Sequence, residues 1–146
     1  MTRILYRLAA IWTGVGLVAG LYYRTLTNSR DFSGQTQLSV SHTHSLALGM
    51  LMMLVLFAIS LVLNLDRKLF SYGIWTYTAS LVVTVGTMIA RGTMQVLGTG
   101  NPESAALAGV SGLGHMGITA ALVMIFLAIG QALKEHHPAE VTPAVR

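Results

Sequence analysis

Three histidines and one arginine carry the chemistry that this sequence offers. His42 and His44 stand one residue apart in the stretch "SVSHTHSLALGM" (39–50), at the entrance to a long apolar run. Arg91 and His115 lie in two later apolar runs. Imidazole binds iron, copper and zinc, and an ionisable side chain within lipid is costly unless it has a partner. These four are the candidate cofactor-binding residues, and the histidines are the candidate metal ligands.

The composition places these residues in a membrane. Of the 146 residues, 53% are hydrophobic and 10% are charged, and the mean hydropathy is +0.65, whereas a soluble domain has about 25% charged residues. Four runs reach the roughly 20 apolar residues that a bilayer requires, at about 4–23, 42–64, 72–97 and 105–133. The chain has no cysteine, which excludes disulfides and thiolate metal sites. Its basic residues form no stripe, which argues against nucleic acid as a partner.

The elements that must position the four residues are therefore transmembrane helices. We predict an all-α integral membrane protein whose four helices form one bundle over residues 1–134, in contact with the lipid bilayer. The polar tail over 135–146 contains two prolines and is predicted to be disordered. Lysines and arginines favour cytoplasmic loops, so both termini are predicted to be cytoplasmic. Six lie on the side of the termini (Arg3, Arg7, Arg67, Lys68, Lys134, Arg146) and two on the other (Arg24, Arg30).

This topology brings the four candidate residues to a similar depth in the outer leaflet, at a rise of 1.5 Å per residue. His42 and His44 point about 200° apart on one helix, so they serve different sides of it. His115 has small neighbours, Ala108, Ser111, Gly112 and Thr119, which permit close helix packing or leave room for a flat macrocycle. Arg91 either reaches the interface or needs an anion, for which Glu103 is the nearest candidate by sequence and a cofactor carboxylate is the alternative.

The stretch "HTHSLALGM" resembles the His-x-His motif of the haem–copper oxidase superfamily, particularly that of the cbb3-type oxidases and nitric oxide reductases. The chain also looks like a small family of four-span bacterial membrane proteins. The first resemblance implies that the two histidines ligate different haems on opposite sides of one helix, and that Arg91 pairs with haem propionates. In that superfamily three arcs of four helices surround a pseudo-threefold axis. The resemblance to four-span bacterial membrane proteins implies that the protein lies in the bacterial inner membrane.

The sequence departs from the oxidases at the copper site. The third span, "TASLVVTVGTMIARGTMQ", lacks the adjacent histidine pair that holds copper, and no His-x-x-x-Tyr pattern is present. Reduction of oxygen or nitric oxide is thus not supported, which argues against an enzyme. The resemblance still implies that the protein binds haem b. Two arrangements compete. In one, haem lies within a chain between His115 and either His44 or His42. In the other, which we favour, it lies between chains of a homotrimer, ligated by His42 of one chain and His44 of the next.

Bis-histidine ligation leaves no open position on the iron, so electron transfer is the expected role. A quinol or another redox partner would supply the electrons, although the sequence contains no convincing quinone motif. One alternative is a haem-based sensor or haem carrier with a labile histidine. Another is a copper- or zinc-binding protein that uses His42, His44 and His115 without haem, with copper less favoured than haem iron.

Overall fold

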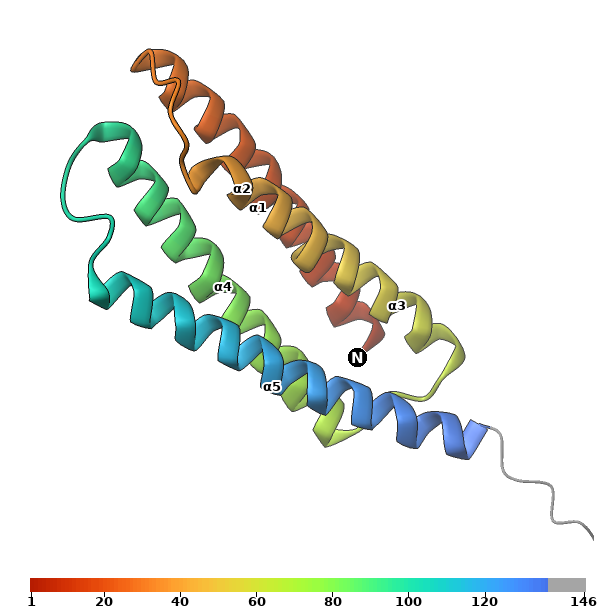
Figure 1. The fold of residues 1–146 in the computed structure, drawn as a ribbon. Coiled ribbons are helices and arrows are strands. Elements are labelled where there is room, and N and C mark those ends of the chain that lie inside the picture. Colours follow the sequence, from red (N-terminus) through yellow and green to blue (C-terminus); the bar gives the residue numbers. More distant parts are fainter. Residues whose placement is uncertain (137–146) are drawn as a thin grey trace, which may run out of the picture.

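The computed structural model describes residues 1–136, and helices joined by short loops are the only regular secondary structure in that part of the chain (Figure 1). The elements are α1 (Thr2–Ser29), α2 (Leu38–His44), the π-helical segment η1 (Ser45–Leu51), α3 (Met52–Val62), α4 (Lys68–Leu97) and α5 (Ala105–His136). Because α2, η1 and α3 continue into one another, the described chain has four helices that are long and apolar enough to cross a membrane. The predicted all-α, multi-pass architecture is confirmed to this extent.

Every helix extends beyond the apolar run that predicted it. The second begins at Leu38 instead of 42, the first reaches Ser29, and the third begins at Lys68. The fourth reaches His136, two residues into the predicted tail over 135–146. Polar residues continue these helices past the hydrocarbon thickness, and Glu135 is held there by an ion pair with Arg67. The remainder of the predicted tail, 137–146, lies outside the described residues.

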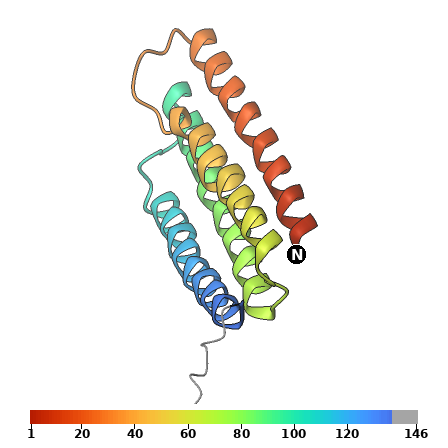
Figure 2. The same ribbon diagram turned by 90° about the vertical axis from the view of Figure 1, so that its right-hand side faces the viewer.

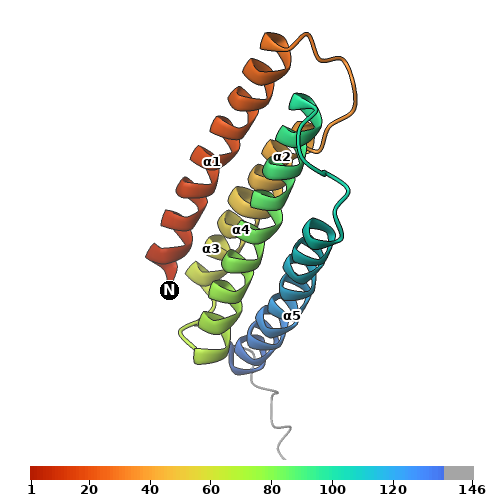
Figure 3. The same ribbon diagram turned by 90° about the vertical axis from the view of Figure 1, so that its left-hand side faces the viewer.

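The four helices form an open row. Helix α1 packs against α2, η1 and α3, α2 packs against α4, and α4 packs against α5. Within residues 1–136, α5 packs on no helix other than α4. Figures 2 and 3 accordingly show α1 and α5 at opposite edges. Most of the buried core lies in the half of the bundle that is nearer to Met1. It includes Trp12, Phe70, Tyr77 and Ile125.

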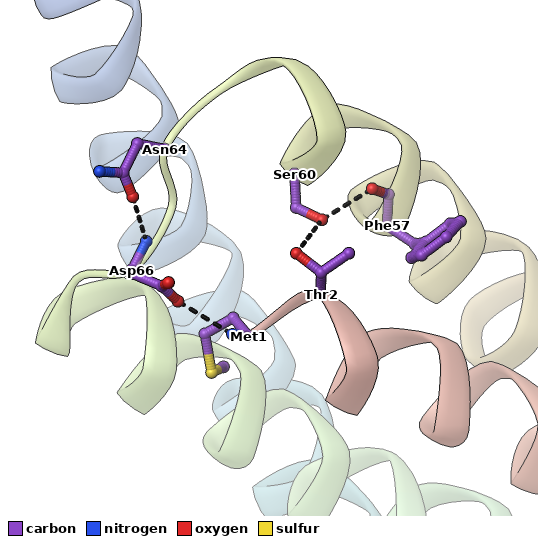
Figure 4. Close-up of polar contacts among 6 residues, drawn as sticks. All are labelled: Met1, Thr2, Phe57, Ser60, Asn64 and Asp66. Atoms are coloured by element: carbon purple, nitrogen blue, oxygen red, sulfur yellow. Dashed lines mark hydrogen bonds and ion pairs between the residues drawn. The ribbon is translucent and has the colours of Figure 1, made fainter.

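One end of the molecule gathers the N-terminus, the loop between α3 and α4, and the end of α5. The N-terminal ammonium of Met1 donates to Asp66 Oδ1 at 2.9 Å, and Ser60 Oγ donates to Thr2 Oγ1 at 3.2 Å (Figure 4). The pair of Arg67 and Glu135 joins the same loop to α5. This end, called the inner end below, therefore carries the predicted cytoplasmic basic residues, apart from Arg146, which is outside the described residues.

The opposite, outer end is closed by a short loop that docks on α4. Thr36 Oγ1 donates to the Gly92 carbonyl at 3.0 Å, and the Gln37 N–H donates to Gln95 Oε1 at 2.8 Å. The backbone of Leu38 lies directly against Gly92, where an added Cβ would come 2.2 Å from the Leu38 nitrogen. These contacts fix the start of α2, and with it the height of both histidines.

Some glycines of α1 and α5 allow close packing between helices, and others do not. Cβ atoms added at Gly114 and Gly117 of α5 would meet Thr84 and Ser80 of α4 at 2.5 and 2.1 Å. The same test finds contacts at Gly16 and Gly20 of α1, whereas nothing lies within 4 Å of such an atom at Gly14, Gly109 or Gly112. The second set of glycines therefore faces away from the helices of the described chain.

Candidate functional site

The two histidines of α2 lie on different sides of that helix. His42 faces α1, because a Cβ added at Gly20 would lie 3.5 Å from His42 Cβ and 3.7 Å from its Cγ. His44 follows two residues later and is therefore turned by about 200°, away from α1. Because α1 and α5 lie at opposite edges of the row (Figure 3), this rotation turns His44 toward the side of α2 on which α5 lies.

His115 lies on the side of α5 that faces α2. Leu113 lines a groove along the α4–α5 contact together with Val83 of α4. On α4, Val83 is nine residues from Gly92, which contacts α2, and nine residues of helix correspond to a rotation of about 180°. The groove therefore opens on the side away from α2. His115 is about 200° from Leu113 around α5, so it lies on the opposite side, toward α2.

His44 and His115 also come to nearly the same height along α4. His44 is six residues, roughly 9 Å, inward from Leu38, which lies against Gly92. Since α2 runs antiparallel to α4, this places His44 level with about Gly86. His115 adjoins Gly114, which packs against Thr84. The two residues thus lie on the facing sides of α2 and α5, within about one helical turn of the same height along α4, and we call them the histidine pair.

Both members of the histidine pair are hydrogen-bonded in the same way. His44 Nδ1 lies 3.0 Å from the Val40 carbonyl, and His115 Nδ1 lies 2.8 Å from the Ser111 carbonyl. A carbonyl oxygen only accepts, so Nδ1 carries the proton and Nε2 keeps its lone pair. Metal-ligating histidines usually have this second hydrogen bond, which fixes the tautomer and the ring orientation. The pair therefore presents two Nε2 atoms suited to a metal.

His42 differs from the histidine pair. Its Nδ1 is buried and has no hydrogen-bond partner within residues 1–136. It therefore lacks the hydrogen bond to a carbonyl that fixes the tautomer and the ring orientation in the histidine pair, and its buried Nδ1 is not accessible to a metal. His42 as placed here is not prepared to ligate.

The guanidinium of Arg91 is paired with a carboxylate of the same chain. It forms an ion pair with Glu103, which lies in the loop between α4 and α5, and its side chain is 21% exposed. Of the two expected partners, the protein supplies Glu103. Arg91 lies seven residues from Thr84, so it shares that residue's face of α4 roughly 10 Å further out. Its Nε is buried and unpaired within the described residues.

No group of three or more His, Cys, Asp or Glu side chains that could hold a metal occurs within residues 1–136. His42, His44 and His115 therefore do not converge on one point in a single chain, as the copper or zinc alternative would need. The arrangement offers two facing imidazoles, with a cation further out on the same face of α4 as the contact with α5.

The comparison with protein families identifies the chain. Residues 1–132 match the family described as "Protein of unknown function (DUF2871)". The chain belongs to the DUF2871 family. No curated protein and no solved structure matches it. The predicted likeness to an uncharacterised family of small membrane proteins is confirmed, whereas the comparisons show no link between this DUF2871 member and the haem–copper oxidases.

Sequence reasoning missed one feature of this DUF2871 chain beside the site. The turn of helix that follows His44 is π-helical over Ser45–Leu51, and such turns are frequent at functional sites. Ser41 and Ser45 are fully buried next to the histidines. Their hydroxyls donate to the carbonyls of Leu38 and Ser41 at 2.8 and 2.9 Å. Neither the π-helix nor the burial of the serines has a signal in the hydropathy pattern.

Proposed function

We propose that this protein is a membrane b-type cytochrome in which His44 and His115 of one chain are the axial ligands of haem b. The observation that carries the proposal is the shared hydrogen bond from Nδ1 to a backbone carbonyl, which leaves both Nε2 atoms available. Two histidines that face one another across α4, on helices that do not touch, suit a flat macrocycle between them. The small residues near His115, including Gly112 with open space beside it, leave room for its edge.

Electron transfer is the role that this ligation supports. Haem supplies a reversible one-electron couple, and two histidine ligands leave no open position for a substrate. The protein would hold the two imidazoles in their tautomers and place the Arg91–Glu103 pair toward the outer end. We propose the bacterial inner membrane, with the inner end and both termini in the cytoplasm, as the setting. The excess of basic residues at the inner end supports this orientation.

The proposed within-chain pair differs from the trimeric arrangement that the sequence favoured. In that arrangement His42 would ligate haem between chains, yet its ring packs toward Gly20 of its own α1 and its Nδ1 is buried. The burial and hydrogen bonding of the three histidines favour His115 over His42. A homotrimer stays a prediction, and the within-chain site does not depend on it.

The absorption spectrum of the purified protein tests the proposal directly. We expect a Soret band and, after reduction, sharp α and β bands, because six-coordinate haem with two imidazole ligands is low-spin. Carbon monoxide should leave the spectrum of the reduced protein unchanged. A colourless protein purified from cells supplied with haem precursor would contradict the proposal. A spectrum that shifts with carbon monoxide would favour the sensor or carrier function. The observation that favours this function is that, within residues 1–136, α5 packs on α4 and on no other helix.

The Arg91–Glu103 pair should set the reduction potential of the haem. A nearby positive charge favours the reduced iron, so Arg91→Leu should lower the potential and loosen haem binding, whereas Glu103→Gln should raise the potential. We expect each variant to shift the free energy of haem reduction by on the order of 1 kcal/mol, the size expected for a partly exposed charge roughly 10 Å from the iron. Redox titration followed at the reduced α band measures them. Arg91→Lys is the control, because it keeps the charge but not the bidentate geometry, and its potential should stay close to that of the wild type.

If the Arg91 and Glu103 variants moved the potential in the same direction, the proposed electrostatic role would be wrong. Unchanged affinity and unchanged potential in all three variants would place Arg91 in a structural role at the end of α4.

A further inference from the structure

A cavity of about 260 Å³, lined mostly by residues with uncharged polar side chains, lies at the outer end of α2, about one helical turn from His44. The residues that line it are Gln35, Thr36, Gln37, Ser39, Val40 and Gln95. No charged side chain is among them, although charged residues are present elsewhere at this end of the molecule. Because an ionic ligand leaving water would need an opposite charge, the cavity suits an uncharged molecule that forms hydrogen bonds.

The hydroxyl groups of the cavity are already engaged. Thr36 Oγ1 donates to the Gly92 carbonyl and accepts from the Leu38 N–H, and Ser39 Oγ donates to the Thr36 carbonyl at 2.8 Å. Their protons are therefore not available to a ligand. The side-chain donors that remain among the lining residues belong to the glutamine carboxamides.

Gln95 is the best-placed of these donors. Its Oε1 accepts the Gln37 N–H at 2.8 Å, which fixes which end of the carboxamide is oxygen and which is nitrogen. Its NH₂ group, with two hydrogens, is then turned away from the Gln37 nitrogen. A ligand that meets such donors must offer acceptor oxygens, and the chemical class that fits is an uncharged ring with carbonyl groups.

The position of the cavity adds a second requirement. The cavity adjoins the histidine pair, because Val40 lines it and the Val40 carbonyl receives the hydrogen bond from His44. It also lies where two apolar helices reach their outer ends, so a ligand could keep an apolar tail in the lipid. We propose that this cavity binds the headgroup of a quinone or quinol and that the quinol reduces haem at the histidine pair. The electron-transfer step rests on the proposed function, whereas quinone binding does not.

The proposed reaction balances with ferric haem as the oxidant. One quinol loses two electrons and two phenolic protons to become a quinone. If haem b is held by the histidine pair, it would accept the electrons one at a time, so the two electrons of one quinol would reduce the ferric haems of two protein chains. The protons leave to water at the outer end, where the cavity opens.

Binding of decylubiquinone to the detergent-solubilised protein, measured by titration calorimetry, tests the inference. Gln95→Glu keeps an oxygen to accept the Gln37 N–H but lacks the NH₂ donor, so we expect about tenfold weaker binding, the loss of roughly one hydrogen bond. Gln37→Met removes a second carboxamide while keeping its backbone N–H, and it should weaken binding about fivefold. Gln131→Glu is the matched control, because it introduces the same charge on the exposed surface of α5 near the inner end.

The outcomes separate this inference from the proposed function. Binding that is absent in the wild type, or weakened equally by Gln131→Glu, would overturn the cavity as a quinone site even if the protein contains haem. A protein without haem that still binds decylubiquinone, with the expected ranking of variants, would overturn the cytochrome and keep the site. Reduction of the haem by decylubiquinol that slows in Gln95→Glu and not in Gln131→Glu supports both.

Discussion

Replacing either His44 or His115 with alanine is expected to abolish the low-spin haem spectrum, whereas replacing His42 should leave it. Each member of the histidine pair donates from Nδ1 to a carbonyl and presents Nε2, so each variant removes one axial ligand. A single remaining imidazole gives five-coordinate, high-spin iron or no retained haem. Absorption spectra of the reduced proteins, scaled to protein concentration, measure the fraction of low-spin haem, which should fall at least about tenfold.

His42→Ala is the matched control for this experiment, because it removes an imidazole two residues from His44 in the same helix. Its Nδ1 is buried and has no hydrogen-bond partner among residues 1–136, so removing the ring leaves no bonded group of those residues without its partner. The between-chain arrangement also requires His44, but it exchanges the other two roles. His42 is then required, and His115 is dispensable. Full haem content in the double variant His44→Ala/His115→Ala would show that neither histidine holds the iron. Comparable yields of membrane-inserted protein distinguish loss of ligand from loss of fold.

Hydropathy predicted the four helices because each needs a long apolar surface to cross lipid. Helix geometry likewise predicted that His42 and His44 serve different sides of one helix. Which side each one serves was not predictable, because it depends on the neighbours. His42 packs against Gly20 of α1, and the helical rotation between the two histidines then turns His44 away from α1. A sequence pattern does not contain the order of helices in space.

The side on which His115 lies was equally beyond the sequence. It follows from the register between α4 and α5, where Gly114 packs against Thr84 and Gly117 against Ser80. A different register would rotate His115 away from α2 without changing the hydropathy of either helix. The partner of Arg91, in contrast, was among the expected ones. Glu103 was the nearest acidic residue by sequence, and a short loop brings it back over the end of α4.

The contact at Gly92 should be among the least tolerant of substitution in the protein. An alanine Cβ there would lie 2.2 Å from the Leu38 nitrogen, 2.6 Å from its Cβ and 2.7 Å from its Cα. Two of these atoms are backbone, so the clash is relieved only by moving α2 away from α4. We expect Gly92→Ala to reduce the free energy of unfolding by about 3 kcal/mol, at the upper end for overpacked sites. Unfolding of the protein in mixed detergent micelles, followed by loss of helical circular dichroism, measures this change.

Gly86→Ala is the control on the same helix, because an added Cβ there meets nothing within 4 Å. Its effect should stay within about 1 kcal/mol, the difference between glycine and alanine in helix propensity. The displacement of α2 in Gly92→Ala also predicts a spectroscopic change, since Leu38 begins the helix that carries His44. Moving that helix breaks the hydrogen bonds of Thr36 and Gln37 to α4 and separates His44 from His115. Equal stability of the two variants would mean that α2 does not dock on α4 at Gly92, and the height assigned to His44 would then be wrong.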